Sequence, residues 1–213
     1  MAQKKKVTAT VFRQEQIAAG IYDMWIETDL AKDAKPGQFI SIYPKNQATL
    51  LPRPISICEV NEEKSALRIV YRVAGQGTRE FSNYHTGESI EILGTLGNGF
   101  PLEKADGKRV FLMGGGIGIP PMLQLSKELS ARGKAENISA ILGYRNELFL
   151  YEDFKAYADV YAATEDGSSG SKGTVMDAIR ENDLKGDIIF ACGPMPMLRA
   201  IKQFAEANQM EAY

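Results

Sequence analysis

The chain has 213 residues, 44% of them hydrophobic and 24% charged, which is enough for one large domain or two small ones with a buried core. The net charge of -2, with a basic run confined to Lys4–Lys6, argues against a nucleic-acid partner. No apolar stretch approaches the ~20 residues of a membrane span or resembles a secretory signal. We therefore predict a cytoplasmic protein with neither nucleic acid nor membrane as a partner.

The sequence offers little side-chain chemistry for catalysis or metal binding. Cys58 and Cys192 are far apart and lack C-x-x-C spacing, and His85 is the only histidine. These residues do not form a recognisable metal site, and a histidine-based catalytic triad is hard to build from them. We expect no catalytic side chain and no metal ligand, so that any reaction is carried by a bound cofactor.

The first half of the chain has the alternating pattern of β-strands. From Val7 to about Gly99, polar and apolar residues alternate over short runs that glycine and proline interrupt, for example at residues 7–11, 39–42 and 89–92. A period of two with frequent turn signals is typical of an antiparallel sheet or barrel. We place this domain at residues 1–102.

Two segments of this half have residue types that suit a bound phosphate and a flat ring. Arg53-Pro54-Ile55-Ser56 combines a fixed cation, a proline and a hydroxyl, and a guanidinium can donate two hydrogen bonds to one phosphate. Residues 69–78 combine an apolar strand, two glycines and Thr78, with a short helix expected over Thr78–Tyr84. Taken singly, each segment can equally be a surface ion pair, a packed strand residue or a hairpin turn.

The second half alternates strands with helix-length segments. Apolar runs are predicted as strands at residues 109–113, 138–143, 160–164 and 187–192, and helices are predicted at residues 121–132, 175–181 and 195–208. This alternation is typical of a parallel, Rossmann-like α/β sheet, which we place at residues 103–213. The final residues, 209–213, have the pattern of a further strand.

A glycine-rich turn follows the first of these strands. The run from Gly114 to Gly118 leads into Pro120-Pro121, and proline suits the first turn of a helix. Such a turn lets the backbone approach a pyrophosphate, although the spacing departs from G-x-G-x-x-G and tight packing alone can require the same glycines. Cys192-Gly193-Pro194 follows another strand, so both motifs are expected at the carboxyl edge of the sheet, where ligands bind.

In this order, the motifs resemble those of the ferredoxin–NADP reductase superfamily, and within it the electron-transfer subunits of type B dihydroorotate dehydrogenase. The resemblance covers essentially the whole chain and rests on residues 51–57, 71–78, 93–100 and 114–118. It implies an FAD-binding barrel followed by a nicotinamide domain. It also implies that hydride passes from NADH to FAD, and that electrons continue to an FMN-containing catalytic subunit of pyrimidine biosynthesis in a heterotetramer.

The resemblance also implies roles for individual residues. FAD would be held by Arg53 at its pyrophosphate, by Pro54, Ile55 and Ser56 beside the ring, by Val70, Tyr71 and Arg72 along the flavin and ribityl chain, and by Gly77 and Thr78 at phosphate. NADH would be bound by Gly115, Gly116 and Gly118 at its pyrophosphate and by Cys192, Gly193 and Pro194 near the nicotinamide. Ser56 and Cys192 would lie near the reacting rings.

One family feature is missing from the sequence. Members continue into a cysteine-rich segment that ligates a [2Fe-2S] cluster, which takes ~4 thiolates, whereas this chain has Cys58 and Cys192 only and ends at Tyr213. We expect either truncation before that segment or direct reduction of a diffusible acceptor. The loop at Arg145 and Glu147 offers both a base and an acid, so NADH is favoured over NADPH by the resemblance alone.

Two other functions remain open from the sequence. A stand-alone NAD(P)H-dependent flavin or ferredoxin reductase would carry the same motifs and would turn over with soluble acceptors. A non-catalytic assembly or regulatory subunit would keep the fold with empty cofactor sites at Arg53 and Thr78.

Overall fold

The computed structural model describes residues 5–46 and 48–213, which form two compact units, Met1–Gly99 and Phe100–Tyr213. We refer to them as the barrel unit and the α/β unit, and describe each by itself. The sequence placed the division after residue 102. Within the described residues, no helix is both long and apolar enough to cross a membrane.

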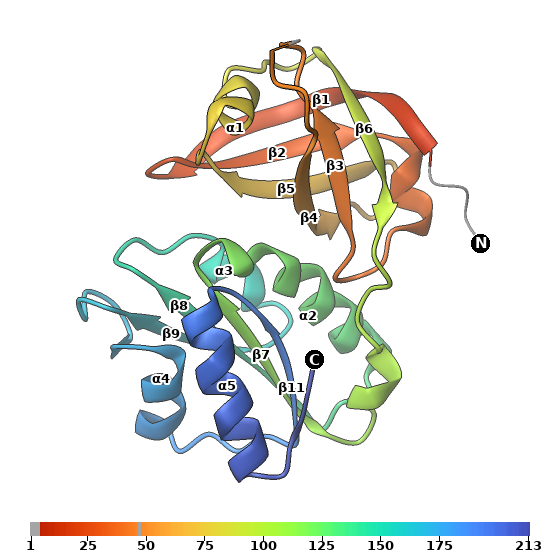
Figure 1. Ribbon diagram of the computed structural model, residues 1–213. Coiled ribbons are helices and arrows are strands. Elements are labelled where there is room, and N and C mark those ends of the chain that lie inside the picture. The colour runs from red at the N-terminus through yellow and green to blue at the C-terminus, as the bar shows by residue number, and fades with distance from the viewer. Residues whose placement is uncertain (1–4, 47) are drawn as a thin grey trace. The chain divides into compact units, whose positions relative to one another are not determined.

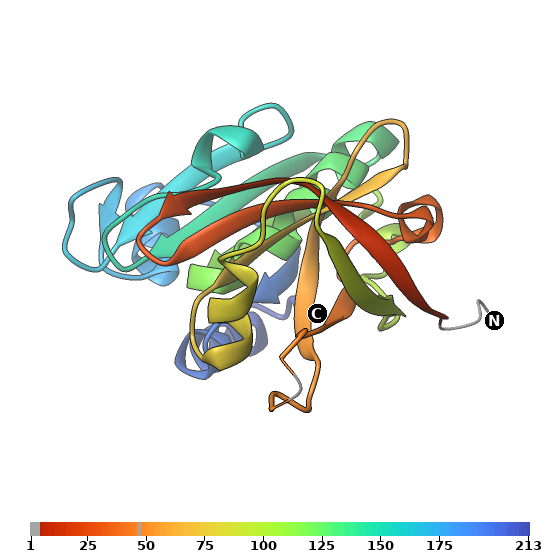
Figure 2. The same cartoon turned by 90° about the horizontal axis from the view of Figure 1, so that it is seen from above.

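The barrel unit is a closed antiparallel barrel with the strand order β1-β2-β5-β4-β3-β6, as the sequence pattern predicted (Figure 1). The strands are β1 (Lys5–Ala18), β2 (Ile21–Glu27), β3 (Phe39–Tyr43), β4 (Arg53–Val60), β5 (Ala66–Arg72) and β6 (Ser89–Leu96). The long strand β1 pairs with β6 along its first half and with β2 along its second (Figure 2). Closure in this way leaves the barrel without a free sheet edge.

Alternate side chains of these strands fill the barrel interior. Val11, Met24, Ile40 and Leu67 are each fully buried there, which is why the sequence alternates with a period of two. The short helix α1 (Gln76–Phe81) follows β5, and the 3-10 helix η1 (Asp29–Asp33) follows β2. Because β2 and β5 are antiparallel, these two segments lie at opposite ends of the barrel.

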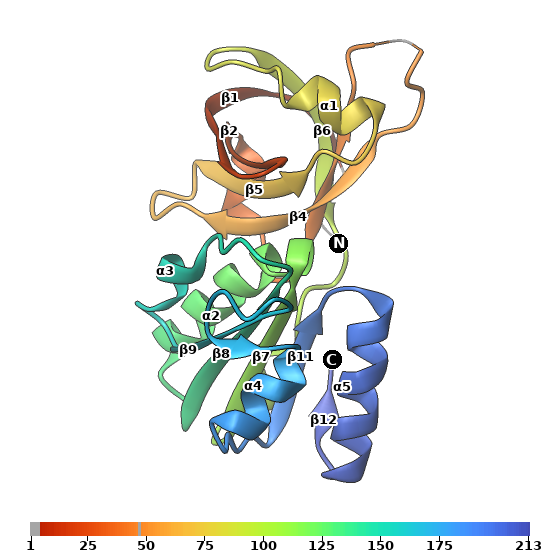
Figure 3. The same cartoon turned by 90° about the vertical axis from the view of Figure 1, so that its left-hand side faces the viewer.

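The α/β unit is a parallel sheet with the order β10-β9-β8-β7-β11-β12. Its strands are β7 (Arg109–Gly115), β8 (Asn137–Tyr144), β9 (Asp159–Thr164), β10 (Ser171–Lys172), β11 (Ile188–Cys192) and β12 (Glu211–Ala212). The helices are α2 (Pro120–Arg132), α3 (Tyr151–Phe154), α4 (Val175–Glu181) and α5 (Met195–Ala207), with short 3-10 turns η2 (Leu102–Ala105) and η3 (Gly116–Gly118). Helices α2 and α3 cover one face of the sheet, and α4 and α5 cover the other (Figure 3).

The predicted strands and long helices of this unit are confirmed to within about two residues at each end. The helix expected over Thr78–Tyr84 instead begins at Gln76. The Thr78 hydroxyl explains why the helix begins earlier than expected. Thr78 Oγ accepts hydrogen bonds from the N–H groups of Ala74 (2.9 Å) and Gly75 (3.1 Å), so Thr78 lies inside the first turn rather than before it. The elements α3 and β10 were not predicted, since each is too short to show a periodic pattern.

Candidate dinucleotide-binding sites

Arg53, the first residue of β4, lies against the short helix α1. Its Nη1 donates a hydrogen bond to the carbonyl oxygen of Leu51 (2.6 Å), and its Nε lies 2.8 Å from where a Cβ on Gly77 would be. Any side chain at residue 77 would therefore displace the guanidinium. The glycine predicted to contact phosphate has a clear role here, because it makes room for the arginine that can bind phosphate.

Three arginines at this end of the barrel are available to an anion. Arg53, Arg72 and Arg79 make no salt bridge with a carboxylate in the described parts of the chain, residues 5–46 and 48–213. By contrast, Arg68 on β5 is mostly buried and binds both Asp23 (2.8 Å) and Glu59 (3.1 Å). Guanidinium groups with free donors are well matched to a diphosphate, so the donor set at this end fits the FAD pyrophosphate.

The other predicted flavin residues differ in what they can offer to a ligand. On β4, Pro54 is exposed and Ile55 and Ser56 are half-buried, so their side chains remain accessible. On β5, Val70 is buried, and Tyr71 is 1% exposed and stacks on Tyr22 with ring centroids 5.9 Å apart. Burial raises the pKa of the Tyr71 phenol, whose hydroxyl donates to Gln14 (2.8 Å). The tyrosine side chain is thus part of the barrel core, which leaves its backbone for any ligand contact.

In the α/β unit, the two predicted nicotinamide motifs lie directly against each other. A Cβ on Gly118 would come within 2.5 Å of the carbonyl carbon of Cys192 and 2.7 Å of the amide nitrogen of Gly193. These are backbone atoms that no rotamer change can move. Gly118 is therefore a glycine because the turn after β7 packs against the turn after β11, and the carboxyl edge of the sheet brings the two motifs together as predicted.

Met197 of α5 fills a notch that two of the glycines leave. Cβ atoms on Gly115 and Gly193 would lie 3.2 Å and 2.6 Å from the Met197 methyl carbon. Gly116 differs from both, because it has a φ of +52° and nothing within 4 Å of its Cβ position. Of the glycines predicted to bind the NADH pyrophosphate, Gly116 is thus the one that borders open space.

The remaining features of this edge are suited to a bound anion rather than to acid–base catalysis. Helix α2 has prolines in its first turn and no side-chain cap, so its positive end is not neutralised by a side chain. Burial raises the pKa of the Cys192 thiol, which keeps it protonated and a poor nucleophile at neutral pH. Pro194 is exposed beside it.

The structure adds an acidic pair that the sequence analysis missed. The N–H of Glu165 donates to the carbonyl oxygens of both Tyr144 and Arg145 (3.2 Å each), and Ser168 Oγ donates to that of Asn146 (3.1 Å). The loop after β9, with its acidic pair Glu165-Asp166, therefore lies beside the loop after β8. The sequence did contain a signal, because adjacent parallel strands end at the same edge of a sheet.

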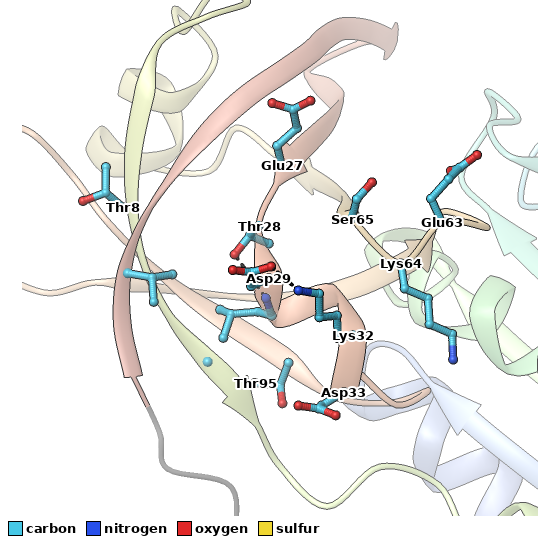
Figure 4. A pocket seen from close by; sticks show the side chains of 13 residues that line it. Thr8, Glu27, Thr28, Asp29, Lys32, Asp33, Glu63, Lys64, Ser65 and Thr95 are labelled. Carbon is cyan, nitrogen blue, oxygen red and sulfur yellow. Dashed lines mark hydrogen bonds and ion pairs between the residues drawn. The ribbon is translucent and has the colours of Figure 1, made fainter.

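A cavity of about 910 Å³ lies at the other end of the barrel and contains none of the predicted site residues (Figure 4). It is lined by η1, the end of β2 and the β4–β5 turn, and its charged residues are Glu27, Asp29, Lys32, Asp33, Glu63 and Lys64. Four carboxylates against two lysines make this cavity unfavourable for a diphosphate, and Lys32 is already paired with Asp29 (2.6 Å). The two ends of the barrel therefore differ in charge.

Comparisons with known proteins agree with this architecture. The family described as oxidoreductase NAD-binding domain matches residues 112–203. The dihydroorotate dehydrogenase B (NAD(+)) electron transfer subunit of Bacillus velezensis is 41% identical over 204 residues, which is 93% of this chain and 79% of the relative. The Bacillus cereus subunit of the same name is 42% identical over 207 residues, which is 95% of this chain and 78% of the relative. The chain belongs to this family of electron transfer subunits.

Solved structures extend the likeness. The NADH-dependent reduced ferredoxin-NADP oxidoreductase has a TM-score of 0.82 and 29% identity over 93% of this chain and 72% of that one. A ferredoxin NADP+ reductase from Neisseria gonorrhoeae has a TM-score of 0.80, and the match covers 96% of this chain and 92% of that one. At 16% identity it shows the shared fold. As a member of the electron transfer subunit family, the chain is an oxidoreductase component, and the resemblance predicted from its motifs is confirmed.

Proposed function

We propose that this chain binds FAD on its barrel unit and NADH on its α/β unit, and passes electrons onward to an FMN-containing dihydroorotate dehydrogenase catalytic subunit in a heterotetramer. The observation that carries the FAD assignment is Arg53, which lies against Gly77. It is at the end of the barrel where Arg53, Arg72 and Arg79 make no salt bridge with a carboxylate among residues 5–46 and 48–213. The family relationship supports the nucleotide and the partner, because the relatives are named NAD(+) electron transfer subunits of dihydroorotate dehydrogenase B.

In this proposal the protein binds and orients, and its side chains do no acid–base or nucleophilic chemistry. Bound FAD supplies a ring that accepts a hydride and releases electrons one at a time. Arg53, with Arg72, would neutralise the diphosphate, and Pro54, Ile55 and Ser56 on β4 would run beside the ring. Gly77 and Thr78 would keep α1 close to that arginine, while Val70 and Tyr71 would hold β5 in place.

On the α/β unit, the turn at Gly115, Gly116 and Gly118 would bind the NADH diphosphate near the uncapped end of α2. Cys192, Gly193 and Pro194 would border the nicotinamide, with the Cys192 thiol neutral. Glu165 and Asp166 would favour NADH, because carboxylates accept hydrogen bonds from a ribose hydroxyl and repel a ribose phosphate. Arg145, which lies beside them, would have the opposite preference.

An iron–sulfur cluster does not fit the described residues. A [2Fe-2S] cluster takes ~4 thiolates, and the two cysteines lie in different units, Cys58 on β4 and Cys192 at the end of β11. No group of three or more potential metal ligands occurs within residues 5–46 and 48–213. We therefore assign no electron-exit step to this chain's own side chains.

The proposal is tested by anaerobic visible spectroscopy of the purified chain, reconstituted with FAD and titrated with NADH. We expect a flavin spectrum that bleaches with NADH. Arg53→Ala should raise the Kd for FAD by about 10- to 150-fold, the equivalent of losing a charge-assisted hydrogen bond of ~1.5–3 kcal/mol, with little change in Tm. A chain that stays colourless after reconstitution would refute the proposal, and an unchanged Kd would remove Arg53 from the site.

A further inference from the structure

The loop between β3 and β4, residues 44–52, presents two leucines to solvent. Leu50 is 85% exposed and Leu51 is 72% exposed, the highest values among the large hydrophobic side chains that the structure describes. Single exposed apolar residues are ordinary, but two adjacent ones on a short loop expose enough apolar area for a ligand or partner to exclude water there.

Residues 45, 46 and 49 of this loop are held by backbone hydrogen bonds, so the leucines that follow are not part of a loose segment. The Glu80 carboxylate on α1 accepts hydrogen bonds from the backbone N–H groups of Lys45 (2.5 Å) and Asn46 (3.2 Å) and from the Tyr84 hydroxyl (2.6 Å). Burial disfavours ionisation of Glu80, but these hydrogen bonds outweigh it and lower the pKa. The Lys45 ammonium binds Glu88 (2.7 Å) at the same place.

The leucines are connected to the arginine of the proposed FAD site. Leu51 offers its carbonyl oxygen to Arg53 Nη1 (2.6 Å), so the loop backbone and the guanidinium are in direct contact. Along β4, the residues that follow Arg53 are those proposed to run beside the flavin ring. Residues 50 and 51 precede Arg53 and lie on its other side along the chain. In FAD, the diphosphate lies between the flavin and the adenosine. With the diphosphate at Arg53 and the flavin beside the residues that follow it, the adenosine would lie beside the residues that precede it.

A neighbouring side chain shows that the loop has an unused hydrogen-bonding group. Thr49 is 8% exposed, and its Oγ has no hydrogen-bond partner among residues 5–46 and 48–213. A buried hydroxyl without a partner is disfavoured, so an adjustment that gives it one would be favourable. The loop is therefore anchored at Glu80 through Lys45 and Asn46, and the Thr49 hydroxyl has no hydrogen-bond partner among the described residues.

We propose that Leu50 and Leu51 form the apolar surface that receives the adenine end of FAD, and that Glu80 is the positioning residue that holds their loop. The inference rests on the proposed function, because it assumes FAD at Arg53. The faces of adenine are flat and largely apolar, which suits contact with two leucine side chains. The alternative occupant, a protein partner, is an outcome of the test below.

The test compares FAD with FMN, which has the flavin and one phosphate but lacks the adenosine. We would measure the Kd of both ligands by flavin fluorescence for the full chain and for the double variant Leu50→Ser with Leu51→Ser. The preference for FAD over FMN, the ratio of the two Kd values, should fall by about tenfold, equivalent to ~1.4 kcal/mol. Phe12→Ser is the matched control, because Phe12 is a 55% exposed aromatic residue on β1 and should leave the ratio unchanged.

Glu80 gives a second, independent arm of the same test. Glu80→Ala removes the acceptor for the Lys45 and Asn46 N–H groups and should lower the preference for FAD in the same direction. Glu80→Gln keeps one acceptor oxygen and should restore part of it. A purely structural role for Glu80 would lower the Tm of the alanine variant and leave the ratio of the two Kd values unchanged.

The outcomes separate this inference from the proposed function. If the unaltered chain binds no FAD, the proposed function fails. If it binds FAD and the leucine variant keeps the same preference for FAD over FMN, the inference alone is overturned. An unchanged preference together with weaker assembly with the catalytic subunit would assign the leucines to a protein contact instead.

Discussion

Replacing Gly118 by alanine should separate the two turns that form the proposed NADH site. The added Cβ would lie 2.5 Å from the Cys192 carbonyl carbon and 2.7 Å from the Gly193 nitrogen, where ordinary contact begins near 3.4 Å. Both neighbours are backbone atoms, so the turns must move apart by about 1 Å. Overpacking of this kind costs ~1–3 kcal/mol, and we expect the upper part of that range. For a unit of this size that corresponds to a fall in Tm of roughly 5–15 °C.

The assay pairs this variant with Gly116→Ala and measures both the Tm and the KM for NADH with a soluble acceptor. Gly116 has open space around its Cβ position but a φ of +52°, so alanine there should cost about 1 kcal/mol of backbone strain without moving the turns. We expect Gly118→Ala to lower the Tm more and to raise the KM more than Gly116→Ala, with FAD retained in both. Equal effects, or an unchanged Tm in Gly118→Ala, would refute the packing argument.

Three further predictions follow from single contacts. Met197→Ala empties the notch at Gly115, so it should lower the free energy of unfolding by ~2 kcal/mol and raise the KM for NADH. Met197→Leu should leave the stability and the KM unchanged. Unfolding curves and steady-state kinetics measure the two effects. Hydrogen bonds from Arg109 lower the pKa of Asp187 to about 2 from 3.8, so the stability it contributes is present above about pH 4 and lost towards pH 2. As the pH falls from about 4 to 2, the free energy of unfolding of the unaltered chain should therefore approach that of Asp187→Asn. A difference between the two that stays constant over this range would contradict the prediction. Replacing Glu165 and Asp166 together by alanine should narrow the preference for NADH over NADPH, measured as a ratio of kcat/KM, and an unchanged ratio would remove both from the site.

The architecture was predictable because its signals are periodic and long. Barrel strands alternate with a period of two because one face of each strand fills the interior, and Val11 and Met24 show this directly. The strands of the α/β unit are covered by helices on both faces, so they read as continuous apolar runs such as residues 110–113. The short elements β10 and α3 carry no period and could not be predicted, whereas β12 (Glu211–Ala212) lies within residues 209–213, where the sequence indicated a further strand.

The site was less predictable, because a residue type does not state what the residue contacts. Glycine at residue 118 indicates close approach, but only the structure shows that the approaching atoms belong to Cys192 and Gly193 rather than to a ligand. Tyr71 lies in a motif that suggests a ligand contact, yet its side chain packs on Tyr22 in the barrel core. Glu80 gave no sequence signal, since its three partners come from residues 45, 46 and 84, and two of them are backbone groups.

Charge, more than cavity size, indicates where the barrel binds its dinucleotide. The cavity of about 910 Å³ at the η1 end offers volume, but its carboxylates outnumber its lysines and would repel a diphosphate. The opposite end offers Arg53, Arg72 and Arg79 without carboxylate partners in the described residues. A diphosphate carries two negative charges over a few ångströms, so the electrostatic term differs in sign between the two ends. A site for an extended, anionic ligand is therefore defined by unpaired cations beside an apolar surface, and the pair Leu50–Leu51 beside Arg53 meets that description.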